Sequence, residues 1–181
     1  MGSASRRLAR AQNRARYRVR QFTRGVRPFL APAEIEAARA HLNTTEFALF
    51  LGAEARDRRP SVDLFEALRA DGGGADGASA VELAAALLHD VGKGRLRTWH
   101  RVAFVLLNAF APWLGRGVEA EQGAPWRQAL WRLRHHARLG AAILEAAGSD
   151  ARLVELVRRH TDAPPEDDPA LARFIALDDQ T

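Results

Sequence analysis

The sequence of 181 residues contains no cysteine, and this absence removes several kinds of chemistry at once. Without thiols the chain can form no disulfide bond, no thiolate metal site and no active site with a cysteine nucleophile. Any metal centre would have to use histidine nitrogens and carboxylate oxygens. A chain without cysteine is compatible with a reducing compartment, and we expect the protein to be cytoplasmic.

Long apolar runs are also missing. The most continuous one, residues 102–114, is too short to span a bilayer and is interrupted by Asn108 and Pro112. Positive charge near the N-terminus is not followed by an apolar core, so we expect neither a transmembrane segment nor a signal peptide. No stretch alternates apolar and polar residues as a half-buried strand does. Because helical spacing recurs instead, the sequence predicts an all-α protein with about six to eight helices beginning near residue 30.

Charge is distributed unevenly along the chain. Residues 1–30 contain nine arginines and no acidic residue, although the formal net charge of the whole chain is only +5. We interpret residues 1–29 as a basic extension and residues 30–181 as one helical domain, long enough for a sizeable hydrophobic core. The extension is either a solvated tail or an arm that makes weak contact with a polyanion such as RNA or acidic lipid.

One stretch places two ionisable side chains at the end of a helix that we expect to be buried. Residues 81–88 are small or apolar apart from one glutamate, and His89 and Asp90 follow them directly. An imidazole and a carboxylate in such a place are costly unless something pairs with them. They are either a helix-capping histidine beside a surface aspartate or two ligands of a divalent cation. The only lysine of the chain, Lys93, follows three residues later, which suggests that this position needs an ammonium group.

Three later helices place single polar residues on their apolar faces. Spacings of three, four and seven residues predict that His136, His160 and Asp178 each point toward the core from a different helix. A single inward histidine is more often a hydrogen-bonded core residue than a metal ligand. Three such residues in successive helices, together with His89 and Asp90, are much harder to explain separately.

The sequence of residues 86–94 (ALLHDVGKG) resembles the signature of the HD-domain metal-dependent phosphohydrolases, in particular the HDIG and HD-GYP-like branch. Residues 135–144 (HHARLGAAIL) and 156–164 (LVRRHTDAP) are similar to the two late-histidine segments of that family. The resemblance covers residues 56–179 and implies an all-α, HD-domain-like helical bundle that acts on phosphate esters or anhydrides. The sequence departs from the family at Pro60, which stands where the first metal-binding histidine usually lies.

The resemblance also implies a metal site and the residues around it. The implied metal ligands are His89, Asp90, His136, His160 and Asp178. One or two divalent ions (Mn, Fe, Mg or Zn) would be bound, with Asp90 as the bridging ligand and water between the ions as the nucleophile. Lys93 and Arg101 would hold phosphate oxygens as catalytic residues. For Arg101 we favour an ion pair with a carboxylate of the site.

Three functions are compatible with these features. The first is a metal-dependent phosphohydrolase acting on a phosphate ester or nucleotide, weakened by the loss of one ligand at Pro60. The second is a catalytically degenerate HD domain that serves as a metal- or nucleotide-binding regulatory or interaction module. In the third, the N-terminal arm is the working part and the helical domain is its scaffold.

Four local expectations concern geometry. Residues 98–110 are apolar on most sides, so the helix that they form should lie at the centre of the domain. Residues 114–124 should form a loop. Pro60 should lie in the first turn of a helix, where proline is accepted. Gly92 and Gly94 should end a helix in the backbone region with positive φ.

Overall fold

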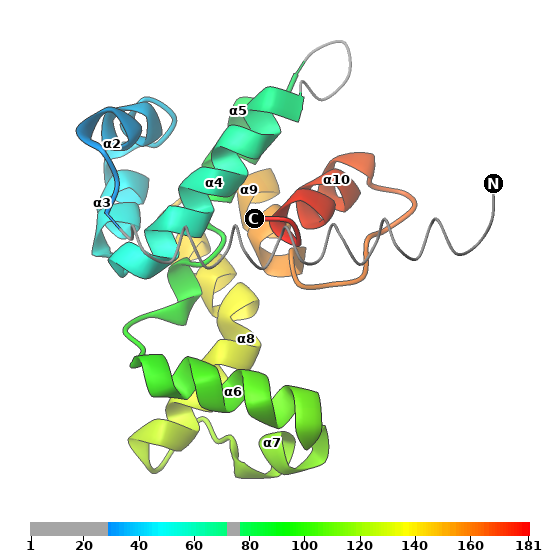
Figure 1. The fold of residues 1–181 in the computed structure, drawn as a ribbon. Coiled ribbons are helices and arrows are strands. Elements are labelled where there is room, and N and C mark those ends of the chain that lie inside the picture. The colour runs from blue at the N-terminus through cyan, green and yellow to red at the C-terminus, as the bar shows by residue number, and fades with distance from the viewer. Residues whose placement is uncertain (1–28, 72–76) are drawn as a thin grey trace, which may run out of the picture.

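The computed structural model describes residues 29–71 and 77–181 of the chain (Figure 1). Within these ranges the secondary structure consists of nine α-helices and one 3-10 helix, without a strand, and the prediction of an all-α fold is confirmed for them. The helices are α2 (Pro32–Arg39), α3 (Thr44–Gly52), α4 (Ala55–Asp71), α5 (Ala80–Leu88), η1 (Val91–Lys93), α6 (Thr98–Phe110), α7 (Pro112–Val118), α8 (Pro125–Ala146), α9 (Ala151–Arg159) and α10 (Pro169–Asp178). Residues 1–28, most of the predicted basic extension, lie outside the described residues.

Helix α5 lies at the centre of the domain. It contacts α3, α4, α9 and α10, and every residue from Glu82 to Leu88 is buried. Its start is fixed by a capping box, in which Ser79 Oγ accepts a hydrogen bond from Glu82 N and the Glu82 carboxylate accepts one from Ser79 N. Because the helix is apolar on all sides, it needs neighbours around its whole circumference.

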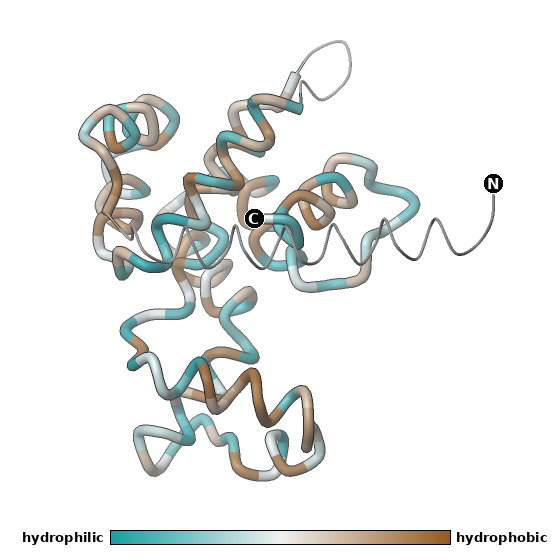
Figure 2. The backbone as a smooth tube through the Cα atoms, viewed as in Figure 1, coloured by the Kyte–Doolittle hydropathy of each residue, from teal (hydrophilic) through white to brown (hydrophobic). Residues whose placement is uncertain are grey.

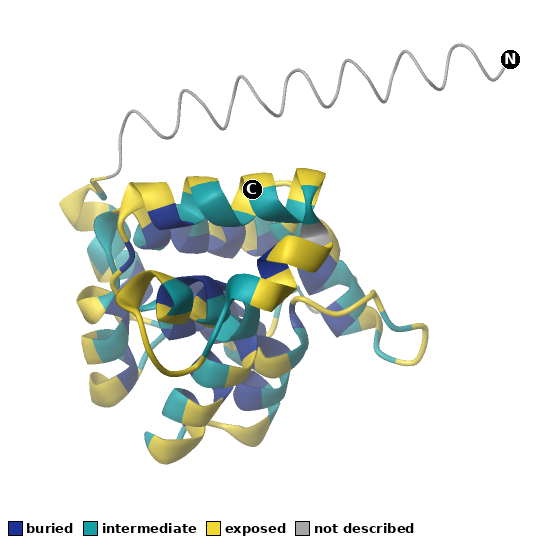
Figure 3. Ribbon diagram, turned by 90° about the horizontal axis from the view of Figure 1, so that it is seen from below, coloured by how far each residue is buried: buried dark blue, intermediate teal, exposed yellow. Residues whose placement is uncertain are grey.

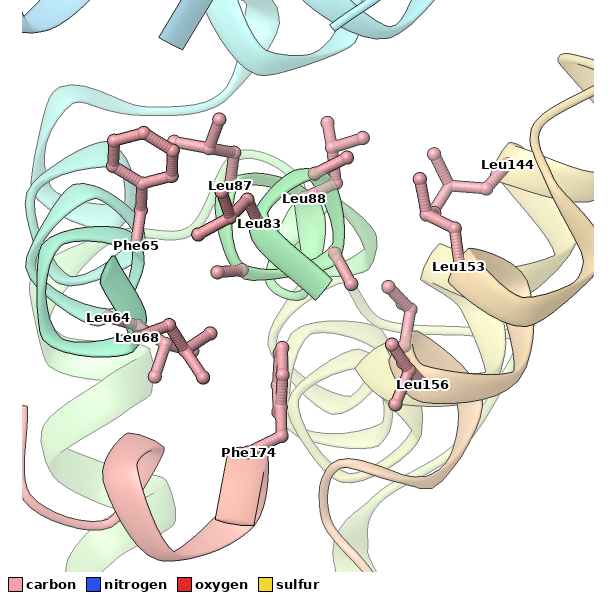
Figure 4. Packing of buried hydrophobic residues seen from close by; sticks show 14 of the residues in the cluster. Leu64, Phe65, Leu68, Leu83, Leu87, Leu88, Leu144, Leu153, Leu156 and Phe174 are labelled. Atoms are coloured by element: carbon pink, nitrogen blue, oxygen red, sulfur yellow. The ribbon is translucent and has the colours of Figure 1, made fainter. Parts of the chain in front are cut away.

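The hydrophobic core is built around α5 by its neighbours (Figure 4). Helix α4 contributes Leu64, Phe65 and Leu68, α8 contributes Leu144, α9 contributes Leu153 and Leu156, and α10 contributes Phe174. Each fully buried Leu or Phe side chain stabilises the fold by about 1.5–3 kcal/mol relative to exposure. The core therefore fixes α5 against α4, α9 and α10, whose ends carry the polar residues of interest.

Helix α4 begins earlier than the sequence predicts. The backbone N–H of Arg58 already donates to Glu54 O at 3.0 Å, so Pro60 lies in the second turn and not in the first. Proline has no N–H to donate to the carbonyl of Arg56, one turn before it. The helix nevertheless continues through Pro60. Val62, Leu64, Phe65 and Leu68 after it are buried in the core, and Asp57 before it is buried against Arg101.

Helix α6 has the predicted bounds but not the predicted place. With α7 and the first turns of α8 it forms one end of the molecule (Figure 1), and only its N-terminal part reaches the start of α4. Only His100 is buried along its length, so the expectation of a central helix is wrong. The predicted loop is also partly wrong, because residues 112–118 form α7, which starts with Pro112 at the first helical position.

Asp168 connects α9 and α10 through the hydrogen bonds of its side chain. Its Oδ1 accepts a hydrogen bond from Leu171 N at 3.0 Å and caps α10, while both of its oxygens accept from the Arg152 guanidinium at 2.6 and 2.7 Å. Hydrogen bonding to Arg152 lowers the pKa of Asp168 to about 2. Because this value lies below that of an unfolded aspartate, the pair stabilises the folded chain above pH 4 and ceases to do so as the pH falls toward 2.

The variant Asp168→Asn keeps the cap and removes only the charge. We expect it to lower the free energy of unfolding at pH 7 by about 0.5–1 kcal/mol, as is usual for an accessible ion pair. The difference from the unsubstituted protein should shrink between about pH 4 and pH 2. Urea unfolding at several pH values measures this, with Asp167→Asn as the matched control, and a difference that does not change with pH would contradict the assignment.

Candidate metal centre

Three histidines share one hydrogen-bonding pattern: His89 and His160 directly follow α5 and α9, and His136 lies in the middle of α8. In each, Nδ1 faces the backbone carbonyl three residues earlier: His89 to Ala86 O at 2.9 Å, His136 to Leu133 O at 2.8 Å and His160 to Val157 O at 2.7 Å. A carbonyl oxygen can only accept, so each Nδ1 carries the hydrogen and donates it. In the neutral ring the lone pair is then on Nε2, which is the usual arrangement of a histidine that binds a metal.

The Nε2 atoms of these rings converge with two carboxylates in two groups. The first group consists of Asp90, His136 and His160, and the second of His89, His160 and Asp178. In each group the potential ligand atoms all lie within 4.8 Å of one another. The structure thus brings together all five residues that the sequence proposes as metal ligands, from the ends of α5 and α10, the start of η1, the middle of α8 and the end of α9.

Asp90 belongs to the first group, and its second oxygen also faces His89 of the second group. Its Oδ1 is 3.5 Å from His136 Nε2, and its Oδ2 is 3.4 Å from His89 Nε2. His89 Nε2 is also 3.4 Å from Asp178 Oδ1. One carboxylate therefore faces both groups with different oxygens, as a bridging ligand does.

The first group contains three hydrogen-bond acceptors that have no donor to pair with when the histidine rings are neutral. His136 Nε2 and His160 Nε2 lie 3.1 Å apart, and both are acceptors when the rings are neutral. Asp90 Oδ1 is buried and has no hydrogen-bond partner. Buried acceptors that face one another are costly, because each has lost its hydrogen bonds to water. A cation placed among two imidazole nitrogens and a carboxylate oxygen would satisfy all three, so this set of atoms fits a divalent metal ion.

Burial and charge set the protonation of the histidines in opposite directions. Burial lowers the pKa of His160 to about 3, assisted by its two histidine neighbours, and it also lowers the pKa of His136. Burial alone would lower the pKa of His89 too, but the carboxylates of Asp90 and Asp178 outweigh it and raise that pKa to about 9. The lowered pKa values favour neutral His136 and His160, which can bind a metal, whereas the raised pKa of His89 favours its protonated form, with one positive charge facing the two carboxylates.

Lys93 and the less buried ligands mark the accessible side of the cluster. The side chains of His89, Asp90 and His160 are only 3–5% exposed, whereas those of Lys93 and Asp178 are 22% and 25% exposed. Lys93 Nζ donates a hydrogen bond to Asp90 Oδ2. Burial would raise the pKa of Asp90, but the positive charges of His89 and Lys93 hold it well below its usual range.

A close contact between backbones holds the signature segment against α8. A Cβ atom added at Gly92 would lie 2.0 Å from His136 O and 2.4 Å from Gly140 N. At Gly140 an added Cβ would lie 3.3 Å from both Gly92 N and a methyl carbon of Val157. Glycine at position 92 is therefore required for space, and the expectation of a positive φ there is wrong. That expectation is confirmed at Gly94, where φ is 61°.

Arg101 is not among the five clustered residues. Its guanidinium donates to both oxygens of Asp57 at 2.6 Å, and Asp57 is buried near the start of α4. The inward ion pair that we expected is present, but its partner is not one of the proposed metal ligands. Sequence reasoning missed Asp57, because an acidic residue between arginines near a helix start looks like an ordinary surface residue.

No residue near Pro60 takes the place of the missing histidine in the groups able to hold a metal, as far as the described residues show. Asp63, the nearest acidic candidate in sequence, forms an ion pair with Arg59 at 2.8 Å. The other histidines also lie outside these groups. His41 packs edge-on against Phe65, and His100 Nδ1 accepts a hydrogen bond from the backbone N–H of Arg97.

Comparison with known proteins agrees with this geometry. The family model of the HD domain matches residues 42–181. The chain belongs to the HD-domain family. Searches of curated proteins and of solved structures gave no match. HD domains generally bind divalent metal ions, and the two groups described above could hold such an ion in this HD domain.

The close backbone contact at Gly92 predicts that a larger residue there would destabilise this HD domain. We expect Gly92→Ala to lower the free energy of unfolding by about 2–3 kcal/mol, because the added methyl group meets backbone atoms that cannot turn aside. Gly52→Ala, at the end of α3, is the matched control, since an added Cβ there meets nothing within 4 Å. Chemical denaturation of both variants measures the effect, and equal stabilities would show that the close contact is not a constraint.

Proposed function

We propose that this protein is a metal-dependent phosphohydrolase that acts on a phosphate ester or a nucleotide. The observation that carries the proposal is the 3.1 Å approach of two Nε2 acceptors beside the unbonded Oδ1 of Asp90, since such a set costs free energy that a cation among the three atoms would remove. Membership in the HD-domain family supports a phosphate-containing substrate. The signature in residues 86–94 further supports the HDIG and HD-GYP-like branch.

The proposed metal ligands fall into two sets that share Asp90. His136, His160 and Asp90 would hold one divalent ion (Mn, Fe, Mg or Zn). His89, Asp90 and Asp178 would hold a second, since His89 Nε2 lies 3.4 Å from an oxygen of each carboxylate; in this set Asp90 takes the place that His160 has in the second group described above. A bound divalent ion lowers the pKa of a water molecule and withdraws charge from a phosphate group. The hydrogen bonds from each Nδ1 to a backbone carbonyl keep the rings oriented before an ion arrives.

Lys93 and Arg101 have different proposed roles. Lys93 lies on the accessible side of the cluster, so its ammonium group is placed to hold phosphate oxygens as negative charge develops on them. Arg101 is bound at both ends of its guanidinium by Asp57, and we propose that it positions α6 against α4 instead of touching the substrate. We also propose a cytoplasmic location, in keeping with the cysteine-free sequence.

Metal binding and hydrolysis test the proposal together. The purified protein should bind Mn or Mg in calorimetric titration and hydrolyse at least one substrate in a panel of phosphodiesters and nucleotides. We expect Asp90→Asn to weaken metal binding by more than about 100-fold and to remove turnover, because Asp90 belongs to both sets of ligands. The exposed Asp162→Asn is the matched control. A metal-free protein whose Asp90→Asn variant behaves identically would contradict every metal-dependent function.

The variant Pro60→His tests whether the missing ligand limits activity. Helix α4 packs against α5 and α10, the two helices that lead to His89 and Asp178. We therefore expect the new imidazole to raise metal affinity at the second set by about tenfold, and the hydrolysis rate with it. Pro60→Ala is the matched control, because it relieves the helix of proline without adding a ligand. Metal binding without turnover, even in Pro60→His, would favour the regulatory alternative.

We also propose that residues 1–29 form a basic extension that makes weak contact with polyanions. Seven of its arginines would carry the interaction: Arg6, Arg7, Arg10, Arg14, Arg16, Arg18 and Arg20. Deleting residues 1–22 should leave thermal unfolding unchanged and weaken binding to single-stranded RNA. The remaining binding should also depend less steeply on salt concentration, since fewer counterions are released. RNA binding that the deletion does not change would refute this role.

A further inference from the structure

Helix α6 carries its apolar side chains on the outside of the molecule. Trp99, Val102, Val105, Leu106 and Phe110 recur at spacings of three and four residues, so they share one face of the helix. Their exposed fractions range from 49% for Trp99 to 82% for Phe110. Phe104 on the opposite face packs against Leu96, Ala129 and Leu133. A surface helix normally turns polar residues toward water, but α6 turns a second apolar face toward water.

Polar contacts on the inner face hold α6 in this orientation. Arg101 points toward α4 and pairs with the buried Asp57 through two hydrogen bonds of 2.6 Å. Asn108 points toward α8, where its Oδ1 accepts a hydrogen bond from Arg134 at 3.0 Å. Rotating the apolar face inward would leave Asp57 buried without its counter-charge, which is strongly unfavourable. The apolar face therefore cannot be covered by a simple rotation of the helix.

The exposed apolar surface continues onto the neighbouring helices. Trp113 and Leu114 of α7 are 72% and 41% exposed, and Trp126 at the start of α8 is 39% exposed. Figure 2 shows hydrophobic segments along α6 and α7, and Figure 3, which looks onto this end of the molecule, shows that exposed segments recur there. Soluble monomers seldom expose apolar surface of this extent without a binding partner.

Basic residues predominate in the segments that form this surface. Residues 91–118 contain five basic residues and no acidic one: Lys93, Arg95, Arg97, Arg101 and Arg116. At the N-terminal end of α6 there is a cavity of about 380 Å³, and the residues that line it include three arginines (Arg56, Arg95 and Arg97) and one acidic residue, Glu54. The surface therefore offers apolar side chains together with a basic hollow suited to an anionic group.

We propose that the α6–α7 face, comprising Trp99, Val102, Val105, Leu106, Phe110, Trp113 and Leu114, docks on an anionic phospholipid bilayer. Tryptophan and phenylalanine side chains enter the interfacial region of a bilayer, while arginines bind headgroup phosphates. A second copy of the chain fits less well, because two basic faces would repel each other. No helix in residues 29–71 or 77–181 has both the length and the apolar composition needed to cross a bilayer, so the contact is a peripheral one.

Vesicle binding by the full-length chain tests the proposal. The protein should sediment with phosphatidylcholine vesicles that contain phosphatidylglycerol and much less with pure phosphatidylcholine. We expect Leu106→Gln to weaken binding by about tenfold, and Leu106→Gln combined with Phe110→Gln by more, because each removes apolar area from the bilayer. Both side chains are exposed, so circular dichroism should show an intact fold.

Leu51→Gln is the matched control, because Leu51 of α3 is 42% exposed, similar to Leu106 at 51%, but lies outside this face. It should bind vesicles like the unsubstituted protein. Three outcomes would overturn the proposal. These are no binding to anionic vesicles, binding that depends on residues 1–22 but not on Leu106 and Phe110, and dimerisation abolished by Leu106→Gln without any vesicle binding. None of these measurements depends on metal binding or hydrolysis, so the hydrolase proposal stands or falls separately.

Discussion

The backbone contact between η1 and α8 is the constraint on which the rest of the site depends. Only glycine fits at position 92, where a side chain would meet His136 O and Gly140 N. The same contact sets Asp90, at the start of η1, beside His136 of α8. Gly140 in turn allows α9 to approach through Val157, and His160 follows three residues later. Two glycines thus bring residues from three separate segments within bonding distance of one point.

The cluster that results is stable only because an extensive apolar core holds the surrounding helices. His89, Asp90 and His160 are buried at the ends of α5 and α9, which pack against each other through fully apolar faces. A protonated His89 faces two carboxylates, while His136 and His160 face each other as neutral acceptors. Such an arrangement costs free energy in the absence of an ion, as functional sites often do, and the core around α5 offsets that cost.

A second buried polar contact decides the shape of the other end of the molecule. Asp57 and Arg101 lie 44 residues apart in the sequence, and their ion pair ties α6 to α4 by its polar face. The pairing leaves Leu106, Phe110 and their neighbours in contact with solvent. The structure therefore has two unusual regions with different physical origins. One contains buried polar groups that need an ion, and the other contains exposed apolar groups that need a partner.

The sequence by itself determined the helical fold, most helix boundaries and the faces on which His136, His160 and Asp178 lie. These properties are local, because a period of 3.6 residues and a capping residue such as Ser79 act within a few turns of the chain. Tertiary structure alone decided the role of Gly92, the partner of Arg101 and the peripheral place of α6. Periodicity shows which face of a helix is apolar, but it does not show whether that face finds a neighbour. In α6 the buried charge of Asp57 outweighed the apolar face, and that competition exists only once distant segments have come together.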